Sequence, residues 1–183
     1  PNGVLLGERQ RLGQAATVYP EVLQVPLVLV GPQFEPGTVI HTPVQLHDLQ
    51  PTLLSLGGLS PTTTHSEYGH SLLSTMSENT RPGPIVAAAW PRTPLSGQVE
   101  QGWRLYRAED EAVIVDADDT VEFYDLNTDP TMTTNRAKDQ PAQATQLAER
   151  ARSAIPIEHT NKIVLSNLAD EETRALRHRG HIH

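Results

Sequence analysis

The pattern of apolar positions first indicates a buried strand near the start of the chain. The sequence VPLVLV at Val25–Val30 is a continuous apolar run rich in β-branched residues, and Gly31 and Pro32 close it. Such a run is typical of a strand that is covered on both faces within a central sheet. We therefore predict a central-sheet strand over these six residues.

A helix is predicted to follow this strand. Asp48 can cap it, and Pro51 falls in the first turn, where a missing N–H costs nothing. Gly57 then ends it. The apolar face is expected to consist of leucines, namely Leu49, Leu53 and Leu56. A strand, a crossover and an amphipathic helix favour an α/β architecture.

The chain changes character after this helix. Residues 61–84 lie in a stretch rich in Ser, Thr, Gly and Pro, which favours a long surface loop between two structural units. Four short strands are predicted beyond it: Ile85–Trp90, Trp103–Arg107, Ala112–Val115 and Val121–Tyr124. An Asp-rich turn at 116–119 joins the last two, so we expect antiparallel pairing.

Two helices are predicted in the last part of the chain. Pro141 can open one that carries Leu147, Ala151 and Ile155, and Asp170 can cap a shorter one. We therefore expect an α/β part over residues 1–60, a linker over 61–84, and a small α+β subdomain with a short antiparallel sheet over 85–183.

Composition and charge exclude several classes of function. The 183 residues carry a net charge of -8, which disfavours nucleic acid as a partner because phosphate contacts need clustered Lys and Arg. There is no cysteine, so disulfides, thiolate metal sites and cysteine nucleophiles are excluded. No run approaches the roughly 20 apolar residues of a membrane span. The chain begins at Pro1 rather than at a methionine, and we expect it to be a fragment.

Several stretches resemble one known family in order and spacing. The sequences TVYPEVLQVPLVLVGP at 17–32 and PGTVIHTPVQLHDLQPTLLSLGG at 36–58 resemble the late part of the sulfatase catalytic domain, within the alkaline phosphatase superfamily. GHSLL at 69–73 and FYDLNTDPTMTTN at 123–135 are similar to segments that follow in that family. The resemblance implies that residues 1–60 complete a sulfatase-type central sheet with flanking helices.

The family's activity would be hydrolysis of a sulfate ester by a formylglycine made from Cys or Ser in Cys/Ser-x-Pro-x-Arg, assisted by a divalent cation, usually calcium. This chain has no cysteine and no serine in that motif, so the covalent step lacks a nucleophile here. We therefore predict a scaffold that is inactive alone, whose partners would be the missing N-terminal catalytic portion of the same fold and a sulfate ester substrate.

The resemblance suggests two candidate site residues. Asn2 and Gly3 fit the family's Asp-Asn-Gly sequence of metal ligands, but Pro1 stands where an Asp would supply the main anionic oxygen to calcium. The ordinary alternative for Asn2 is a turn residue. Gln14 occupies the position of a sulfate-contacting His or Lys, although a neutral amide cannot offset developing negative charge as a cation can. We expect no calcium bound by this chain alone.

Four other groupings have ordinary structural explanations that we prefer. Asp48 beside a histidine is explained by helix capping. Two further candidates are a terminal histidine cluster and an acidic turn, for which we expect a frayed tail and a solvated hairpin: His178, His181 and His183; Asp116, Asp118 and Asp119. Ser71 and Ser74 near His70 lack the Gly-x-Ser-x-Gly elbow of a hydrolase triad.

Two rival functions stay open at this point. The chain could belong to a degenerate sulfatase-like protein that keeps the fold as a binding or structural module. It could also belong to a phosphodiesterase or phosphatase of the same superfamily that uses Ser or Thr as its nucleophile. The upstream sequence and an assay of sulfate against phosphate esters would separate these.

Overall fold

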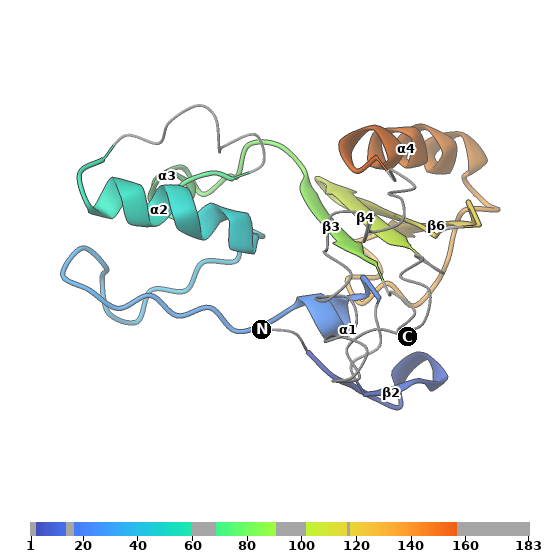
Figure 1. Cartoon of the computed structure of the whole chain (residues 1–183), viewed down its shortest axis with the longest axis horizontal. Helices are drawn as coiled ribbons and strands as arrows, with labels where there is room; N and C mark the ends of the chain where they lie inside the picture. The colour runs from blue at the N-terminus through green and yellow to red at the C-terminus, as the bar shows by residue number, and fades with distance from the viewer. Residues whose placement is uncertain (1–2, 14–16, 60–68, 91–101, 117, 157–183) are drawn as a thin grey trace, which may run out of the picture.

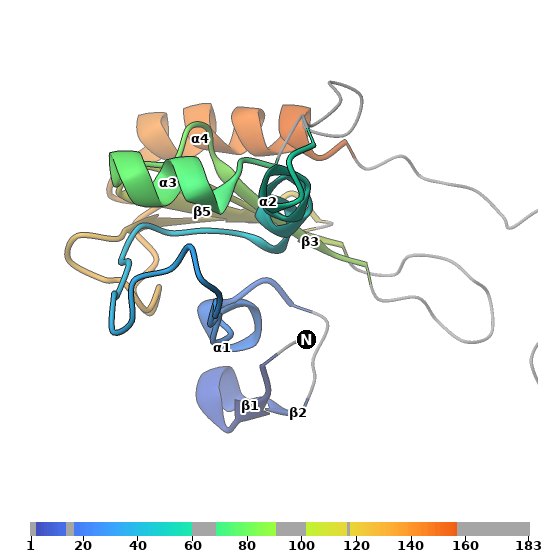
Figure 2. The same cartoon turned by 90° about the vertical axis from the view of Figure 1, so that its left-hand side faces the viewer.

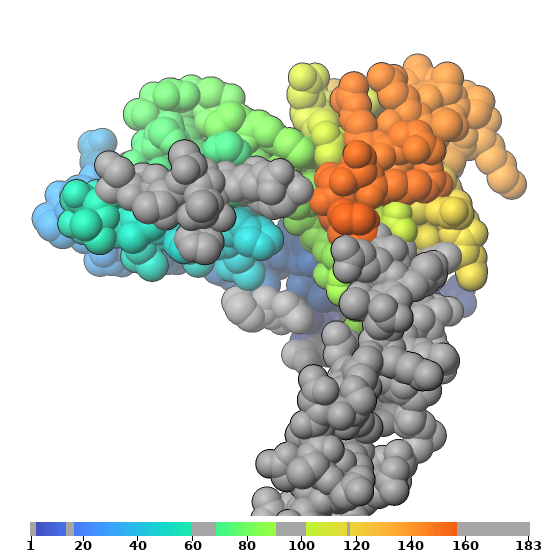
Figure 3. All heavy atoms as spheres, turned by 45° about the horizontal axis from the view of Figure 1, so that its top comes forward, coloured from blue at the N-terminus to red at the C-terminus, as the bar shows by residue number. Residues whose placement is uncertain are grey.

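The structure is a computed structural model that describes residues 3–13, 17–59, 69–90, 102–116 and 118–156. It shows a four-stranded antiparallel sheet with helix α4 (Pro141–Ala154) on one face. A pair of helices, α2 (Leu49–Leu56) and α3 (Leu72–Glu78), lies beside the sheet (Figure 1). The space-filling view shows this pair, in cyan and green, next to α4 in orange (Figure 3). The predicted mixed α/β class is confirmed.

The sheet is a simple meander in the order β3-β4-β5-β6. Its strands are β3 (Ile85–Ala89), β4 (Trp103–Ala108), β5 (Glu111–Val115) and β6 (Val121–Asp125). The Asp116 carboxylate shapes the turn before β6, because it accepts the backbone N–H groups of Asp118 at 2.9 Å and Thr120 at 2.8 Å. The four predicted strands, their antiparallel pairing and the Asp-rich turn are confirmed.

The core of this subdomain has two halves, one on each face of β5. Val113 and Val115 point toward α4, where they meet Phe123 and an apolar helix stripe. The stripe has the spacing of one helix face, and consists of Ala144, Leu147, Ala148 and Ala151. The predicted helix at Pro141 is confirmed, whereas the helix expected at Asp170 lies outside the described residues.

The N-terminal segment covers the opposite face of the sheet. It contains the short pair β1 (Leu5–Leu6) and β2 (Leu12–Gly13), the 3-10 turn η1 (Glu8–Gln10), and α1 (Pro20–Leu23). Val18 and Tyr19 are buried against Ile114 and Tyr124 of the sheet. The result is three layers, with the N-terminal segment, the sheet and α4 stacked in that order (Figures 1 and 2).

Gly3 fixes the start of this segment against α1. Its N–H donates to the carbonyl oxygen of Val22 at 2.7 Å. A Cβ at this position would lie 2.0 Å from the carbonyl oxygen of Glu21, so only glycine fits so close to the backbone.

The prediction of a paired strand at Val25–Val30 is wrong for the described structure. The segment is extended but belongs to no sheet, and Val28 and Val30 are 79% and 91% exposed. The physical reason is that the described part of the chain offers no neighbouring strand beside it. Figure 2 shows the segment and the loop after it as a blue trace below α3.

Two expectations for the helical pair are also corrected. The predicted helix begins at Leu49 and ends at Leu56, but Pro51 and Thr52 form its buried side while Leu53 is 67% exposed. The stretch 61–84, expected to be a loop, contains α3, because Ser71 caps a helix whose Leu72 and Thr75 are buried. The boundary between the two predicted domains stays a prediction. No helix in the described ranges is long and apolar enough to cross a membrane.

Candidate functional site

The most buried polar group in the described chain is the carboxylate of Asp48, which is fully buried at the start of α2. Arg81 pairs with it side-on, with Nε 3.0 Å from Oδ2 and one terminal nitrogen 3.0 Å from Oδ1. The backbone N–H groups of Gln45 and His70 donate to the same carboxylate at 2.9 and 2.8 Å. Four donors thus satisfy both oxygens. We call Asp48 and Arg81 the buried ion pair.

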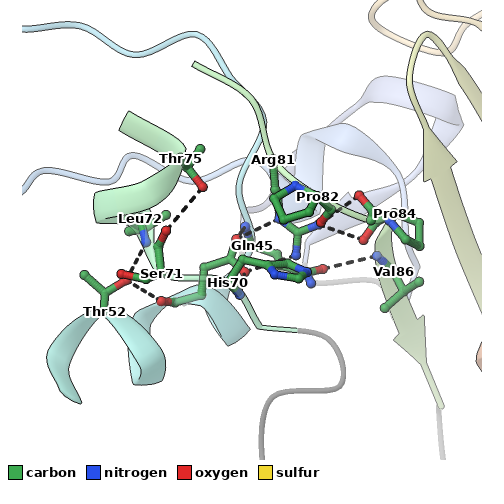
Figure 4. Close-up of polar contacts among 12 residues, drawn as sticks. Gln45, Thr52, His70, Ser71, Leu72, Thr75, Arg81, Pro82, Pro84 and Val86 are labelled. Carbon is green, nitrogen blue, oxygen red and sulfur yellow. Dashed lines mark hydrogen bonds and ion pairs between the residues drawn. The ribbon is translucent and has the colours of Figure 1, made fainter. Parts of the chain in front are cut away.

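The contacts of this ion pair join three stretches that are far apart in the sequence: residues 45–52, 70–75 and 81–86. Figure 4 shows the labelled residues of these stretches around Arg81. Arg81 also donates to three consecutive carbonyl oxygens in the residues that precede β3. These are the carbonyl oxygens of Pro82 at 3.3 Å, Gly83 at 3.1 Å and Pro84 at 2.9 Å. The side-chain oxygen of Gln45 accepts the N–H of Val86 in β3 at 3.2 Å. The α2–α3 pair is therefore tied to the edge of the sheet.

The start of α3 is built onto α2 by neighbouring polar contacts. The Thr52 hydroxyl donates to the carbonyl of Asp48 and accepts the N–H of Leu72 at 2.8 Å. The Ser71 hydroxyl accepts the N–H of Leu73 at 3.3 Å, which is a helix cap. Ser71 is thus engaged in capping, and the Gly-His-Ser-Leu stretch positions two helices.

Charge sets the ionisation of the buried ion pair. Burial raises the pKa of Asp48, but the hydrogen bonds from Arg81, His70 and Gln45 and the positive charge of Arg81 outweigh burial, so that the pKa lies below its usual value. The carboxylate is therefore ionised at neutral pH. Asp48 occupies the expected position before α2. Its carboxylate does not cap α2 itself, but it completes a capping box with Gln45 at the 3-10 turn η2 (Leu46–Asp48) that leads into α2, and it also binds Arg81.

A second polar cluster connects the N-terminal segment to the sheet. The hydroxyl of Tyr19 donates to the carboxylate of Glu122, with oxygens at 2.9 and 3.0 Å, and Tyr124 donates to the same group at 2.7 Å. The Arg9 guanidinium lies 3.8 Å from the centre of the Tyr19 ring. Burial and the Glu122 charge raise the pKa of Tyr19 to about 12 and also raise that of Tyr124.

The stretch 123–135, which the sequence likened to a sulfatase segment, runs from the end of β6 into a loop that covers the outer edge of this strand. The Asp129 carboxylate accepts the N–H groups of Thr133 and Thr134, both at 2.7 Å. The Asn135 side chain accepts the N–H of Phe123 at 3.1 Å, and Phe123 in turn accepts the N–H of Arg136 at 2.8 Å. These contacts give this stretch a structural role.

The structure does not describe the site residues predicted from the sequence. Asn2 and Gln14 lie outside the described residues, as do His178, His181 and His183. In the ranges that are described, no group of three or more His, Asp or Glu side chains could hold a metal ion. The calcium site that the resemblance implies at Asn2 therefore stays a prediction, and we assign no chemical step to a cation.

The structure contains an apolar groove that the sequence analysis did not predict. It has a volume of about 660 Å³ and runs between α3 and the segment 27–44, which contains turns at 31–37. Its walls are mostly aliphatic and include Leu27, Val30, Val39 and Met76. The apolar run VPLVLV could have indicated this groove, because its residues line it. The sequence analysis instead assigned the run to a buried strand of a sheet.

Comparisons with known proteins agree with this fold. No family model matches the chain. The chain is 27% identical over 146 residues to Arylsulfatase K of Xenopus laevis. The alignment covers 76% of this chain and 27% of that protein. It superposes on a protein of Bacteroides thetaiotaomicron assigned as a sulfatase with a TM-score of 0.66, at 21% identity, over 84% of this chain and 33% of the other.

Another solved relative, a 2-O GAG sulfatase, gives a TM-score of 0.61 at 22% identity, over 79% of this chain and 32% of that one. The chain therefore has a sulfatase-like fold, and the sequence resemblance to sulfatases is confirmed. It spans only about a quarter to a third of the length of these relatives.

Proposed function

We propose that this chain is the C-terminal scaffold of a sulfuric ester hydrolase and that it is inactive alone. The observation that carries the proposal is the coverage: most of this chain aligns with sulfatases, yet it accounts for only 27 to 33% of their length. The nucleophile motif is absent from the sequence, and in the proposed protein the missing N-terminal catalytic portion supplies it together with the ligands of a divalent cation.

The polar clusters support a scaffold role. The Asp48 carboxylate is satisfied by four donors from the chain itself, and the Glu122 carboxylate accepts two tyrosine hydroxyls. A general base needs a lone pair directed at a substrate proton, whereas these carboxylates are used to join segments of the fold. The polar clusters thus hold the segments of this chain together as part of the proposed larger domain.

The proposed substrate is a sulfate ester, and its remaining structure is left open. One solved relative was determined with its substrate D-glucosamine-2-N,6-O-disulfate, and the chain superposes on it with a TM-score of 0.56 at 19% identity, over 83% of this chain and 32% of that one. That substrate belongs to the relative. The wall of the substrate pocket in the present protein would be built jointly with the N-terminal portion.

The test compares three preparations: the chain alone, the product of the gene read from its upstream coding sequence, and that product ending before Pro1. Each is assayed with an aryl sulfate and with an aryl phosphate diester, with and without millimolar Ca²⁺. We expect sulfate hydrolysis by the complete product only.

Each other result contradicts a defined part of the proposal. Sulfate turnover by the chain alone would refute the scaffold role. Turnover of phosphate esters in preference to sulfate would favour a phosphoesterase of the same superfamily. A complete product that hydrolyses neither, or an upstream sequence without Cys/Ser-x-Pro-x-Arg, would favour a non-catalytic binding or structural protein.

A further inference from the structure

We propose that Arg11 and Trp103 form a recognition point for the organic portion of the ester, and that they select an ester whose organic portion carries a second anionic oxygen group, either a carboxylate or another sulfate. This inference rests on the proposed function and adds a specificity element to it. The recognition point joins two parts of the fold, because Arg11 follows η1 in the N-terminal segment and Trp103 begins β4 of the sheet.

The first observation is that the Arg11 guanidinium is exposed and not neutralised. It lies 5.6 Å from the centre of the Trp103 ring and makes no hydrogen bond or ion pair with a described residue. Arg9, two residues earlier, is by contrast fully engaged. It pairs with Glu21 at 3.3 Å and donates to the carbonyl oxygen of Thr131 at 2.9 Å. Arg9 therefore holds the fold together, whereas the N–H donors of Arg11 are available to an outside partner.

Three acidic side chains of the same region do not compete for Arg11. Glu8 accepts a backbone N–H of β1, and Glu21 binds Arg9. Glu122 accepts two tyrosine hydroxyls. An anion that approaches Arg11 therefore meets a cation whose charge these groups leave uncompensated. A guanidinium binds a carboxylate or a sulfate through two parallel N–H donors, which is the geometry that favours these anions.

The second observation is that the Trp103 ring is held in place from below. It is partly buried and packs against the core cluster that contains Val18 and Tyr19. The ring centres of Trp103 and Tyr19 are 5.9 Å apart with their planes at 54°. The Tyr19 hydroxyl is in turn fixed by Glu122. The indole is thus a rigid apolar platform beside an exposed cation, and a flat organic group can lie on it.

The third observation is the short distance along the chain to the candidate site residues. Arg11 is three residues from Gln14, which is at most about 11 Å even in a fully extended chain. Gly13, which precedes Gln14, pairs with Leu5, three residues after Asn2. An ester whose sulfate lies at Gln14 therefore has its organic portion within reach of Arg11.

A purely structural role for Arg11 is the alternative. The separation of 5.6 Å is close to the limit of about 6 Å for a cation–π contact, and exposed contacts of this kind contribute little. We therefore expect Arg11→Gln to leave the midpoint of urea unfolding unchanged. A structural role would instead lower the midpoint and reduce the turnover of every ester alike.

The experiment measures kcat/KM of the complete gene product with a matched pair of esters. Para-carboxyphenyl sulfate carries the second anion, and para-carbamoylphenyl sulfate is its neutral counterpart of the same shape. The ratio of the two kcat/KM values is compared between variants, so that the intrinsic reactivities of the esters cancel. We expect Arg11→Gln to lower this ratio about 10- to 100-fold, and Arg11→Lys to restore part of it. Para-phenylene disulfate repeats the measurement with a second sulfate.

The matched control is Arg150→Gln. Arg150 is an exposed arginine of α4 that makes no ion pair with a described residue, and α4 lies on the face of the sheet opposite the N-terminal segment. The control removes the same charge and should leave the ratio unchanged. Trp103→Leu should raise KM for both phenyl esters about 2- to 10-fold, whereas Trp103→Phe keeps an aromatic face and should keep KM near the parent value.

The outcomes separate this inference from the proposed function. If the complete product hydrolyses no ester, both fail. If it hydrolyses sulfate esters and Arg11→Gln leaves the ratio unchanged for both second anions, or lowers it no more than Arg150→Gln, the recognition point is refuted while the proposed function stands. If phosphate esters are preferred and the same charged group still gives a ratio that falls in Arg11→Gln, the proposed function is wrong and the recognition point is supported. A ratio that falls with only one of the two second anions identifies the anion that Arg11 selects.

Discussion

Replacing Arg81 by methionine should strongly destabilise the α2–α3 pair. The change keeps much of the side-chain volume but leaves the fully buried Asp48 carboxylate with only the N–H groups of Gln45 and His70. Removing one partner of a buried ion pair costs about 3 to 5 kcal/mol, because an uncompensated charge stays in a poorly solvated place. Three carbonyl contacts of Arg81 are lost as well.

The measurement is urea unfolding of the chain together with hydrogen exchange resolved by segment. We expect amides in α2 and α3 to lose protection while those in α4 keep most of theirs, because α4 is buried against Val113, Val115 and Phe123 of the sheet and not against the α2–α3 pair. The matched control is Arg152→Met, whose partners Asp119 and Glu149 are largely exposed. Exposed pairs contribute at most about 1 kcal/mol.

A double variant tests whether the loss of stability in Arg81→Met arises from the unpaired charge of Asp48. Adding Asp48→Asn to Arg81→Met removes the negative charge and should recover part of the lost stability, since an amide is far cheaper to bury than an unpaired carboxylate. A loss below about 1 kcal/mol for Arg81→Met, or a double variant less stable than Arg81→Met, would refute this account of the ion pair.

Three further predictions concern alkaline pH, a glycine and calcium. The pKa of Tyr19 is raised to about 12 from an unfolded value near 10, so its contribution is complete below pH 10 and is lost as pH rises from 10 to 12. A pH titration of urea unfolding should show this loss, and Tyr19→Phe should reduce it. Gly69→Ala should destabilise the chain by more than about 2 kcal/mol in the same assay, because the new Cβ would lie 2.4 Å from the carbonyl oxygen of His47. A stable Gly69→Ala protein would contradict the close approach. Calorimetry with millimolar Ca²⁺ should leave Tm unchanged, and a clear rise would instead indicate a working cation site near Asn2.

The small antiparallel sheet was predictable because its determinants are local. Each strand carries its own alternating or apolar pattern, and the turn before β6 is specified by an aspartate that bonds to N–H groups two and four residues ahead. The stripe of α4 likewise repeats at the spacing of one helix face. Such signals need no knowledge of distant sequence.

The buried ion pair was not predictable because its members are far apart. Arg81 is 33 residues from Asp48, and nothing in the sequence near Arg81 marks it as a buried partner. For the same reason, the sequence placed Asp48 correctly at the start of the helical segment but did not reveal Arg81 as its partner. Burial of Val25–Val30 depends on neighbouring strands that the described chain does not contain. The apolar pattern therefore predicted a buried strand, whereas Val28 and Val30 are exposed.

The protection of the sheet edges has a consequence for aggregation. In the middle of β6, both backbone groups of Phe123 are occupied by Asn135 and Arg136, and on the opposite edge the N–H of Val86 is held by Gln45. Foreign strands therefore find these edges partly blocked. In concentrated solutions of the isolated chain, self-association should begin at Val25–Val30, and a mutation that loosens Asn135 should open a second, non-native route to fibrous aggregates.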